Sequence, residues 1–259
     1  MVKVTVSSEK DVLAEATRHA LKLMKEAGFE IPHDVKVSID PELPFMGYST
    51  KMGGKGVIVV SGKAVKSGMV EGLLIHEMCH IYRTDTHHPS HNHKLLDRVG
   101  FSVLRERHLR EGYKIKVIQE AINHVQDLYA DDVSFQVFSK SGIFPFAQVL
   151  SFFLSWIEEE PVKSGNAKTS WLNVGTMLSN CFVLSNMERH RVTGVDDLAE
   201  KKAKKFLSRS HKRMSEEFLH IRDYMVNLRE NPTENEFEEG LSDYLRRVIR
   251  LADECAATR

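Results

Sequence analysis

The sequence contains few cysteines, and this shortage limits the folds that it can encode. Among 259 residues there are three, Cys79, Cys181 and Cys255, which lie far apart. An odd number of widely spaced cysteines argues against a disulfide framework and indicates a reducing compartment. Residues 1–19 also lack the apolar stretch of a secretory signal. We therefore expect a cytoplasmic protein.

Net charge and long apolar runs are absent as well. The 36 basic residues balance 36 acidic ones, so composition gives no reason to expect nucleic acid or an anionic membrane as the main partner. The longest apolar stretch, residues 143–157, contains Pro145 and Gln148. It is shorter than the roughly 20 residues of a membrane-spanning helix. We expect a buried helix there, without stable membrane insertion.

The apolar pattern predicts a few strands near the N-terminus and helices elsewhere. Strands are expected at residues 2–6, 34–40 and 56–62, with a hairpin between 46–51 and 56–61 around Gly53–Gly54. Helices are expected at residues 8–27, 66–83, 93–111, 113–139, 145–158, 168–191, 195–229 and 233–256. The predicted fold class is α+β and mostly helical. We expect a strand-and-helix core in residues 1–140 and a helical part in residues 141–259 packed on it.

One short motif stands out in the predicted helix at residues 66–83. The segment LLIHEMCH places His76 and His80 four residues apart with Glu77 after the first histidine. Residues four apart lie one above the other on a helix, so both imidazoles can face one metal ion. Glu77 lies about 100° further round, where it can hold a water beside that ion. Cys79 points away from the histidines and is expected to pack in the core.

This HExxH segment resembles the zincin metallopeptidases and, more narrowly, the uncharacterised predicted metallopeptidases found mainly in archaea. The resemblance implies a zincin-like fold in which His76 and His80 bind Zn²⁺. It also implies that Glu77 is the general base, which deprotonates a zinc-bound water to hydrolyse a peptide bond. The expected partner is a peptide or protein substrate.

A catalytic zinc site needs a third protein ligand and one position left for water. The metzincin pattern would place a histidine where Thr86 stands, so it does not apply. A better source is the predicted helix at residues 113–139. Its side chains Glu120, His124, Asp127 and Asp131 fall within about 60° of one another. Residues 117–139 contain no lysine or arginine, which favours a face that lines a metal site over a solvated one.

The segment DLYAD within this helix resembles the acid-x-x-Ala-Asp form of several zinc peptidase families, with aspartate in place of the usual glutamate. The resemblance implies that Asp127 binds the metal and that Asp131 accepts a hydrogen bond from a ligand histidine. His124, Glu120 and the histidine-rich loop at residues 87–94 stay open as other third ligands. Candidates to stabilise an oxyanion are Tyr82, Arg83, Tyr129, His190 and His211, and the sequence does not choose among them.

Two other functions compete with zinc-dependent peptide hydrolysis. The first is a non-catalytic binding or regulatory protein stabilised by zinc, in which His124 and Asp127 would both bind and exclude water. The second is nucleic-acid binding by the basic stretch at residues 200–213, although a solvated helix face is the simpler interpretation of that stretch.

Overall fold

The computed structural model describes residues 9–143, 146–163, 165–192 and 196–257. The strand expected at residues 2–6 lies outside these ranges. The described residues confirm a mostly helical α+β protein with three strands. They divide into two compact units, Met1–His88 with Ala130–Phe144, and Pro89–Tyr129 with Pro145–Arg259. The long helix α5 (Gly112–Ser141) is continuous and contributes residues to both units.

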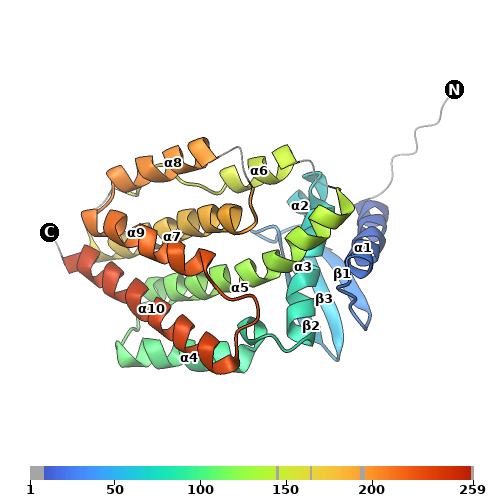
Figure 1. The fold of residues 1–259 in the computed structure, drawn as a ribbon, viewed down its shortest axis with the longest axis horizontal. Coiled ribbons are helices and arrows are strands. Elements are labelled where there is room, and N and C mark those ends of the chain that lie inside the picture. The colour runs from blue at the N-terminus through green and yellow to red at the C-terminus, as the bar shows by residue number, and fades with distance from the viewer. Residues whose placement is uncertain (1–8, 144–145, 164, 193–195, 258–259) are drawn as a thin grey trace. The chain divides into compact units, whose positions relative to one another are not determined.

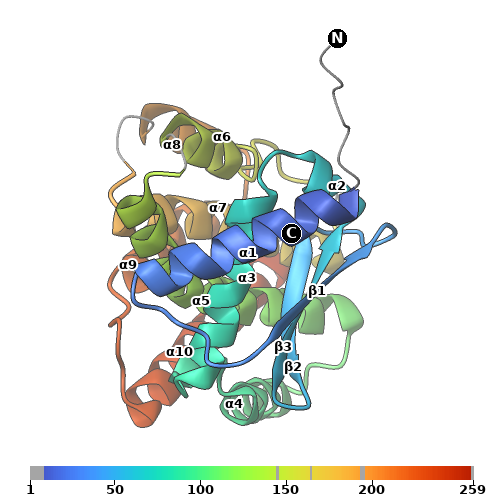
Figure 2. The same cartoon turned by 90° about the vertical axis from the view of Figure 1, so that its right-hand side faces the viewer.

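The first unit contains a small sheet of mixed direction in the order β1-β3-β2. Strand β3 (Lys55–Ser61) pairs in parallel with β1 (Val35–Asp40) and antiparallel with β2 (Gly47–Met52). The β2–β3 hairpin was predicted, and Gly53 and Gly54 form its turn with φ angles of 57° and 78°, a region that glycine adopts without strain. Figure 2 shows the three strands beside the helices of this unit.

Helices α1 (Glu9–Glu26), α2 (Gly62–Lys66) and α3 (Val70–Asp85) complete this unit together with the end of α5. Ile58 and Val60 on one face of β3 are fully buried in a core with Met24 of α1 and Met78 of α3. Gly56 allows α3 to approach closely, because a Cβ there would lie 2.8 Å from Cδ1 of Ile81.

The helix expected at residues 66–83 is interrupted in the structure. Helix α2 ends at Lys66 and α3 begins at Val70. Between them, Gly68 has a φ of 71°, which lies outside the helical region. The interruption lies before the HExxH segment, so both histidines stand on the single helix α3.

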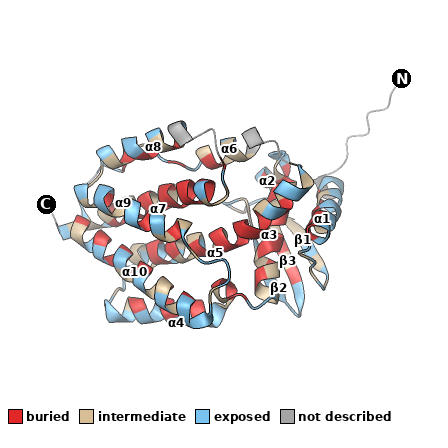
Figure 3. Ribbon diagram, in the orientation of Figure 1, coloured by how far each residue is buried: buried red, intermediate tan, exposed pale blue. Residues whose placement is uncertain are grey.

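The second unit is helical within the described residues. It contains a short 3-10 turn (Pro89–His91), α4 (His93–Glu106), α6 (Phe146–Leu154), α7 (Ala167–Arg189), α8 (Asp196–Ser208), α9 (Lys212–Val226) and α10 (Glu234–Ala257). Figure 1 labels these helices, and Figure 3 shows that much of α7 is buried. Trp171 and Cys181 on it are fully buried. No helix of the described residues is long and apolar enough to cross a membrane.

Helices α4 and α9 begin at side chains that cap them. Asn92 accepts a hydrogen bond from the backbone N–H of Leu95. The prediction of a single helix at residues 195–229 is wrong, because the structure has two helices there, α8 and α9. His211 caps α9 by accepting a hydrogen bond from the N–H of Arg213. A capping histidine gives little signal in helical periodicity.

Candidate metal centre

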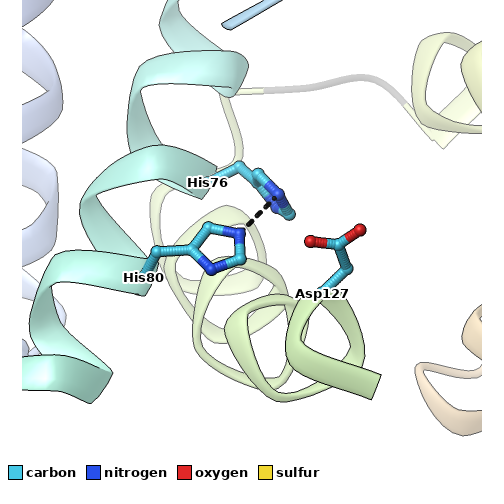
Figure 4. Close-up of side chains that lie close together, drawn as sticks. All are labelled: His76, His80 and Asp127. Carbon is cyan, nitrogen blue, oxygen red and sulfur yellow. Dashed lines mark hydrogen bonds between the residues drawn. The ribbon is translucent and has the colours of Figure 1, made fainter. Parts of the chain in front are cut away.

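Two histidines on α3 direct their ring nitrogens toward one point. Nε2 of His76 and Nε2 of His80 are 3.1 Å apart, and the two rings are nearly perpendicular. Both side chains are half-buried, so an ion could reach them from solvent. Figure 4 shows the two rings projecting from successive turns of the helix. The spacing of four residues produces this arrangement, as predicted from the sequence.

Asp131 fixes the orientation of the first histidine. Nδ1 of His76 lies 2.7 Å from Oδ1 of Asp131, which is buried at the end of α5 that belongs to the first unit. Ser134 donates a second hydrogen bond to the same oxygen. When Nδ1 of His76 carries the proton, Nε2 keeps a free lone pair for a metal ion.

Asp127 precedes Asp131 by one turn of the same continuous helix. A carboxylate oxygen of Asp127 and one nitrogen each from His76 and His80 lie within 4.8 Å of one another (Figure 4). Among the described residues, these are the only three side chains of histidine, cysteine or acidic residues that converge in this way. Two histidines and one carboxylate form a donor set that suits zinc.

His124, which the sequence left open as a third ligand, is placed in the second unit among aromatic side chains. Its ring stacks on Phe182 with centroids 5.0 Å apart, and Nε2 lies 3.4 Å from Oγ of Ser179. Its Nδ1 is buried without a hydrogen-bond partner. Burial lowers the pKa of His124 from 6.5 to about 4, although the charge of Asp127 acts in the opposite direction.

The other open candidates are also outside the converging group. Glu120 forms an exposed ion pair with Lys116, 3.7 Å long. In the histidine-rich loop, His87 is exposed, and His91 is buried with its Nδ1 2.8 Å from Oγ of Ser90.

Glu77 and Cys79 are both buried in α3. Only 6% of the surface of Glu77 is exposed to solvent. Cys79 is fully buried, as predicted, and its Sγ lies 3.8 Å from Sδ of Met24. Burial raises the pKa of the Cys79 thiol well above 9.0, and the charge of Asp131 adds to this shift. A raised pKa favours the protonated thiol, in keeping with the packing of Cys79 in the core.

A buried ion pair beside these residues was missed from the sequence. Nη2 of Arg83 lies 4.0 Å from Oδ2 of Asp132, and the two residues are 6% and 7% exposed. The sequence offers Arg83 only as a group that could stabilise an oxyanion. The available signal was a single arginine directly after Ile81 and Tyr82 in α3, and sequence reasoning alone would place such an arginine at the surface.

Comparison with known families gives one match. The model of a family of unknown function, DUF5781, matches residues 3–250, so the chain belongs to this family. Comparison with curated proteins and with solved structures finds no match.

Proposed function

We propose that the protein is a zinc-dependent metallopeptidase with a zincin-like fold, which hydrolyses peptide bonds. The observation that carries the proposal is the convergence of His76 and His80, with His76 oriented by Asp131. If both rings carry their proton on Nδ1, the two Nε2 lone pairs face one point, and Asp131 supplies the carboxylate partner that ligand histidines usually have. The membership in a family of unknown function neither adds to the proposal nor opposes it.

The distances fit a zinc ion. Zinc–nitrogen bonds of 2.0–2.1 Å at a tetrahedral angle place two ligand nitrogens about 3.3 Å apart. The separation of 3.1 Å between the two Nε2 atoms is within a few tenths of an ångström of that value. Asp127 would be the third ligand after a small movement of its side chain. Three protein ligands leave one position open, as a catalytic site requires.

Each residue then has a defined task. Bound zinc would supply Lewis acidity, which polarises a peptide carbonyl and makes a water more acidic. Asp131 would hold the proton of His76 on Nδ1. Glu77, adjacent to the first ligand on α3, would accept a proton from the attacking water and deliver it to the leaving nitrogen.

Metal content tests the proposal directly. Elemental mass spectrometry on protein purified without chelator or histidine tag should find about one zinc per chain. The variant Asp127→Ala should lose it, whereas His124→Ala and Glu120→Ala should retain it. A wild type that contains no zinc, and takes up none when zinc is added, would rule out the hydrolase.

Activity is the second test. The wild type should hydrolyse members of a mixed peptide library. The variant Glu77→Gln should keep its zinc and lose hydrolysis by at least about 100-fold, since general-base catalysis typically contributes 10²–10⁴-fold.

A non-catalytic protein stabilised by zinc is the second candidate. The observation that favours it is the burial of Glu77, which shelters the proposed base from water. In this case zinc would raise the melting temperature of wild type and of Glu77→Gln alike, and neither protein would hydrolyse peptides. The position of His124 against Phe182 argues against a site closed by that histidine.

We propose the cytoplasm as the compartment and a peptide or protein as the partner. Cys79, Cys181 and Cys255 are buried free thiols, which is compatible with a reducing environment. The basic stretch that suggested nucleic-acid binding is paired with acids of its own unit. Lys202 and Lys205 lie 3.3 Å and 2.7 Å from the carboxylate oxygens of Glu159.

A further inference from the structure

The buried pair of Arg83 and Asp132 is an unusual choice for the core of a small unit. Both residues are almost inaccessible to solvent. Transfer of two ions from water into a protein interior is costly, and apolar side chains of similar volume are often equally or more stabilising. Stability therefore explains the pair poorly. The location of Arg83 and Asp132 relative to the histidines suggests another role.

The two acids of α5 reach two positions on α3 that lie on either side of His80. Asp131 contacts His76, and its neighbour Asp132 pairs with Arg83. His76 and Arg83 are seven residues apart, so they lie on nearly the same face of α3, about 10 Å apart along its axis. His80 lies between them on that face.

Two separate contacts restrict movements that one contact would permit. A single hydrogen bond between His76 and Asp131 would allow α3 to pivot about that point. A second contact at Arg83 opposes both this pivoting and sliding along the helix axis. The apolar residues of α5 in the same core, Ala130 and Val133, pack against their neighbours without a strong directional preference. The hydrogen bond at His76 supplies a direction, and the charge attraction between Arg83 and Asp132 favours the register that keeps these two side chains together.

We propose that Arg83 and Asp132 form a positioning pair, which holds the histidine-bearing face of α3 in register with the carboxylate-bearing face of α5. Binding sites require their ligands to be held within about 0.5 Å of the productive geometry. The pair acts on the metal through His76, His80 and Asp127 and does not touch the ion. This inference rests on the metal binding of the proposed function and is independent of peptidase activity.

The decisive variant replaces both ions at once, Arg83→Met with Asp132→Leu. The double change leaves the net charge of the surroundings the same, so a change in metal affinity cannot come from altered attraction of the cation. We expect the zinc Kd, measured by competition with a chromophoric chelator, to rise about 10-fold, which is typical of changes to groups that support metal ligands. The urea midpoint of the metal-free protein should stay at or above the wild-type value.

Lys140→Met is the matched control. Lys140 also lies on the part of α5 that belongs to the first unit, and its Nζ donates a hydrogen bond to the carbonyl of Ala27 at 2.7 Å. It also stands over the ring of Phe29. Its removal should lower the urea midpoint and leave the zinc Kd within two-fold of wild type, because it attaches α5 to the chain after α1 rather than to α3.

Conservative single variants keep the proposal testable if the double variant does not fold. Asp132→Asn should weaken zinc binding about 3- to 10-fold, and Arg83→Lys, which retains the charge, should stay within about three-fold of wild type. Cobalt in place of zinc gives a second readout, because its visible absorption reports ligand geometry. The cobalt spectrum should change in Asp132→Asn and stay unchanged in Lys140→Met.

The outcomes separate the two proposals. If wild type binds no zinc, the proposed function fails and the positioning role fails with it. If wild type binds zinc and the folded double variant binds it equally tightly with the same cobalt spectrum, the positioning role is overturned while the metal site stands. A higher Kd in the double variant at an unchanged urea midpoint supports the positioning role.

Discussion

Two histidines of this protein, His76 on α3 and His124 on α5, lie on long helices and yet have opposite surroundings. The imidazole of His76 has Asp131 at one nitrogen and His80 at the other. The imidazole of His124 packs against Phe182 like an aromatic ring, and one of its nitrogens is buried without a partner. The contrast shows that a carboxylate at the far nitrogen, rather than proximity to the motif, distinguishes a candidate ligand from a packing residue.

Removal of a proposed ligand should change zinc affinity more than any other substitution, and removal of His124 should not change it. Structural zinc sites with four ligands bind with about 10–16 kcal/mol, so one ligand contributes roughly 2.5–4 kcal/mol. His80→Ala should therefore weaken zinc binding by about 100- to 1000-fold in a chelator competition. His124→Phe is the control and should bind zinc as wild type does. Loss of zinc from the His124 variant as well would contradict the separation of the two histidines.

The pH dependence of stability should reveal His124. Burial lowers its pKa to about 4, whereas the unfolded chain has a value near 6.5. Between these values the unfolded chain binds a proton that the folded chain does not, so stability is complete above pH 6.5 and falls as the pH decreases toward 4. The loss should be at most about 3.4 kcal/mol.

Urea unfolding of metal-free protein at pH 7, 5.5 and 4 measures this loss. Because other groups also titrate, the relevant quantity is the difference between wild type and His124→Phe. The variant should lose less stability over this range. Parallel pH profiles of the two proteins would show that His124 is not the group responsible.

Asp131→Asn tests the role of the carboxylate beside His76 and should lower zinc affinity less than His80→Ala does. The amide oxygen can still accept the hydrogen bond from His76, but the negative charge that strengthens the imidazole as a ligand is lost. We expect zinc affinity to fall about 10- to 100-fold, or 1.4–2.7 kcal/mol. The measurement is the same chelator competition. An affinity equal to that of wild type would mean that Asp131 does not support the ligand.

Glu120→Gln should have the smallest effect. Glu120 is on the same predicted face of α5 as Asp127, but its partner is the exposed Lys116. Exposed ion pairs contribute roughly 0–1 kcal/mol, so both the zinc Kd and the unfolding free energy should stay close to wild type. A loss of zinc from this variant would return Glu120 to the set of candidate ligands.

Local signals in the sequence predicted much of the fold. The hairpin of β2 and β3 follows from alternating residues around two glycines, and its observed register confirms it. The parallel pairing of β1 with β3 could not be predicted, because it depends on where the intervening chain crosses. The break between α8 and α9 was hidden, since it depends on a cap formed by His211 rather than on proline or glycine.

The candidate site was predictable only where one helix determines it. His76 and His80 converge because helical geometry requires it at a spacing of four. The candidates for a third ligand lie on another helix, where Glu120, His124 and Asp127 share one face within about 60°. The sequence could not decide among them, because α5 passes from one compact unit to the other and its neighbours change along its length. For the same reason, the sequence offered no prediction for Asp132.

Because α5 is divided between two units, the ribosome makes the two parts of the first unit at different times. The first unit is assembled from Met1–His88 and Ala130–Phe144, with a part of the second unit encoded between them. His76 therefore leaves the ribosome 55 residues before its partner Asp131. At a rate of roughly 5–20 residues per second, Asp131 is synthesised about 3–11 s after His76, the histidine that it orients. During this interval the nascent chain carries a pair of histidines without that partner, and a metal ion captured early would be held by two ligands alone.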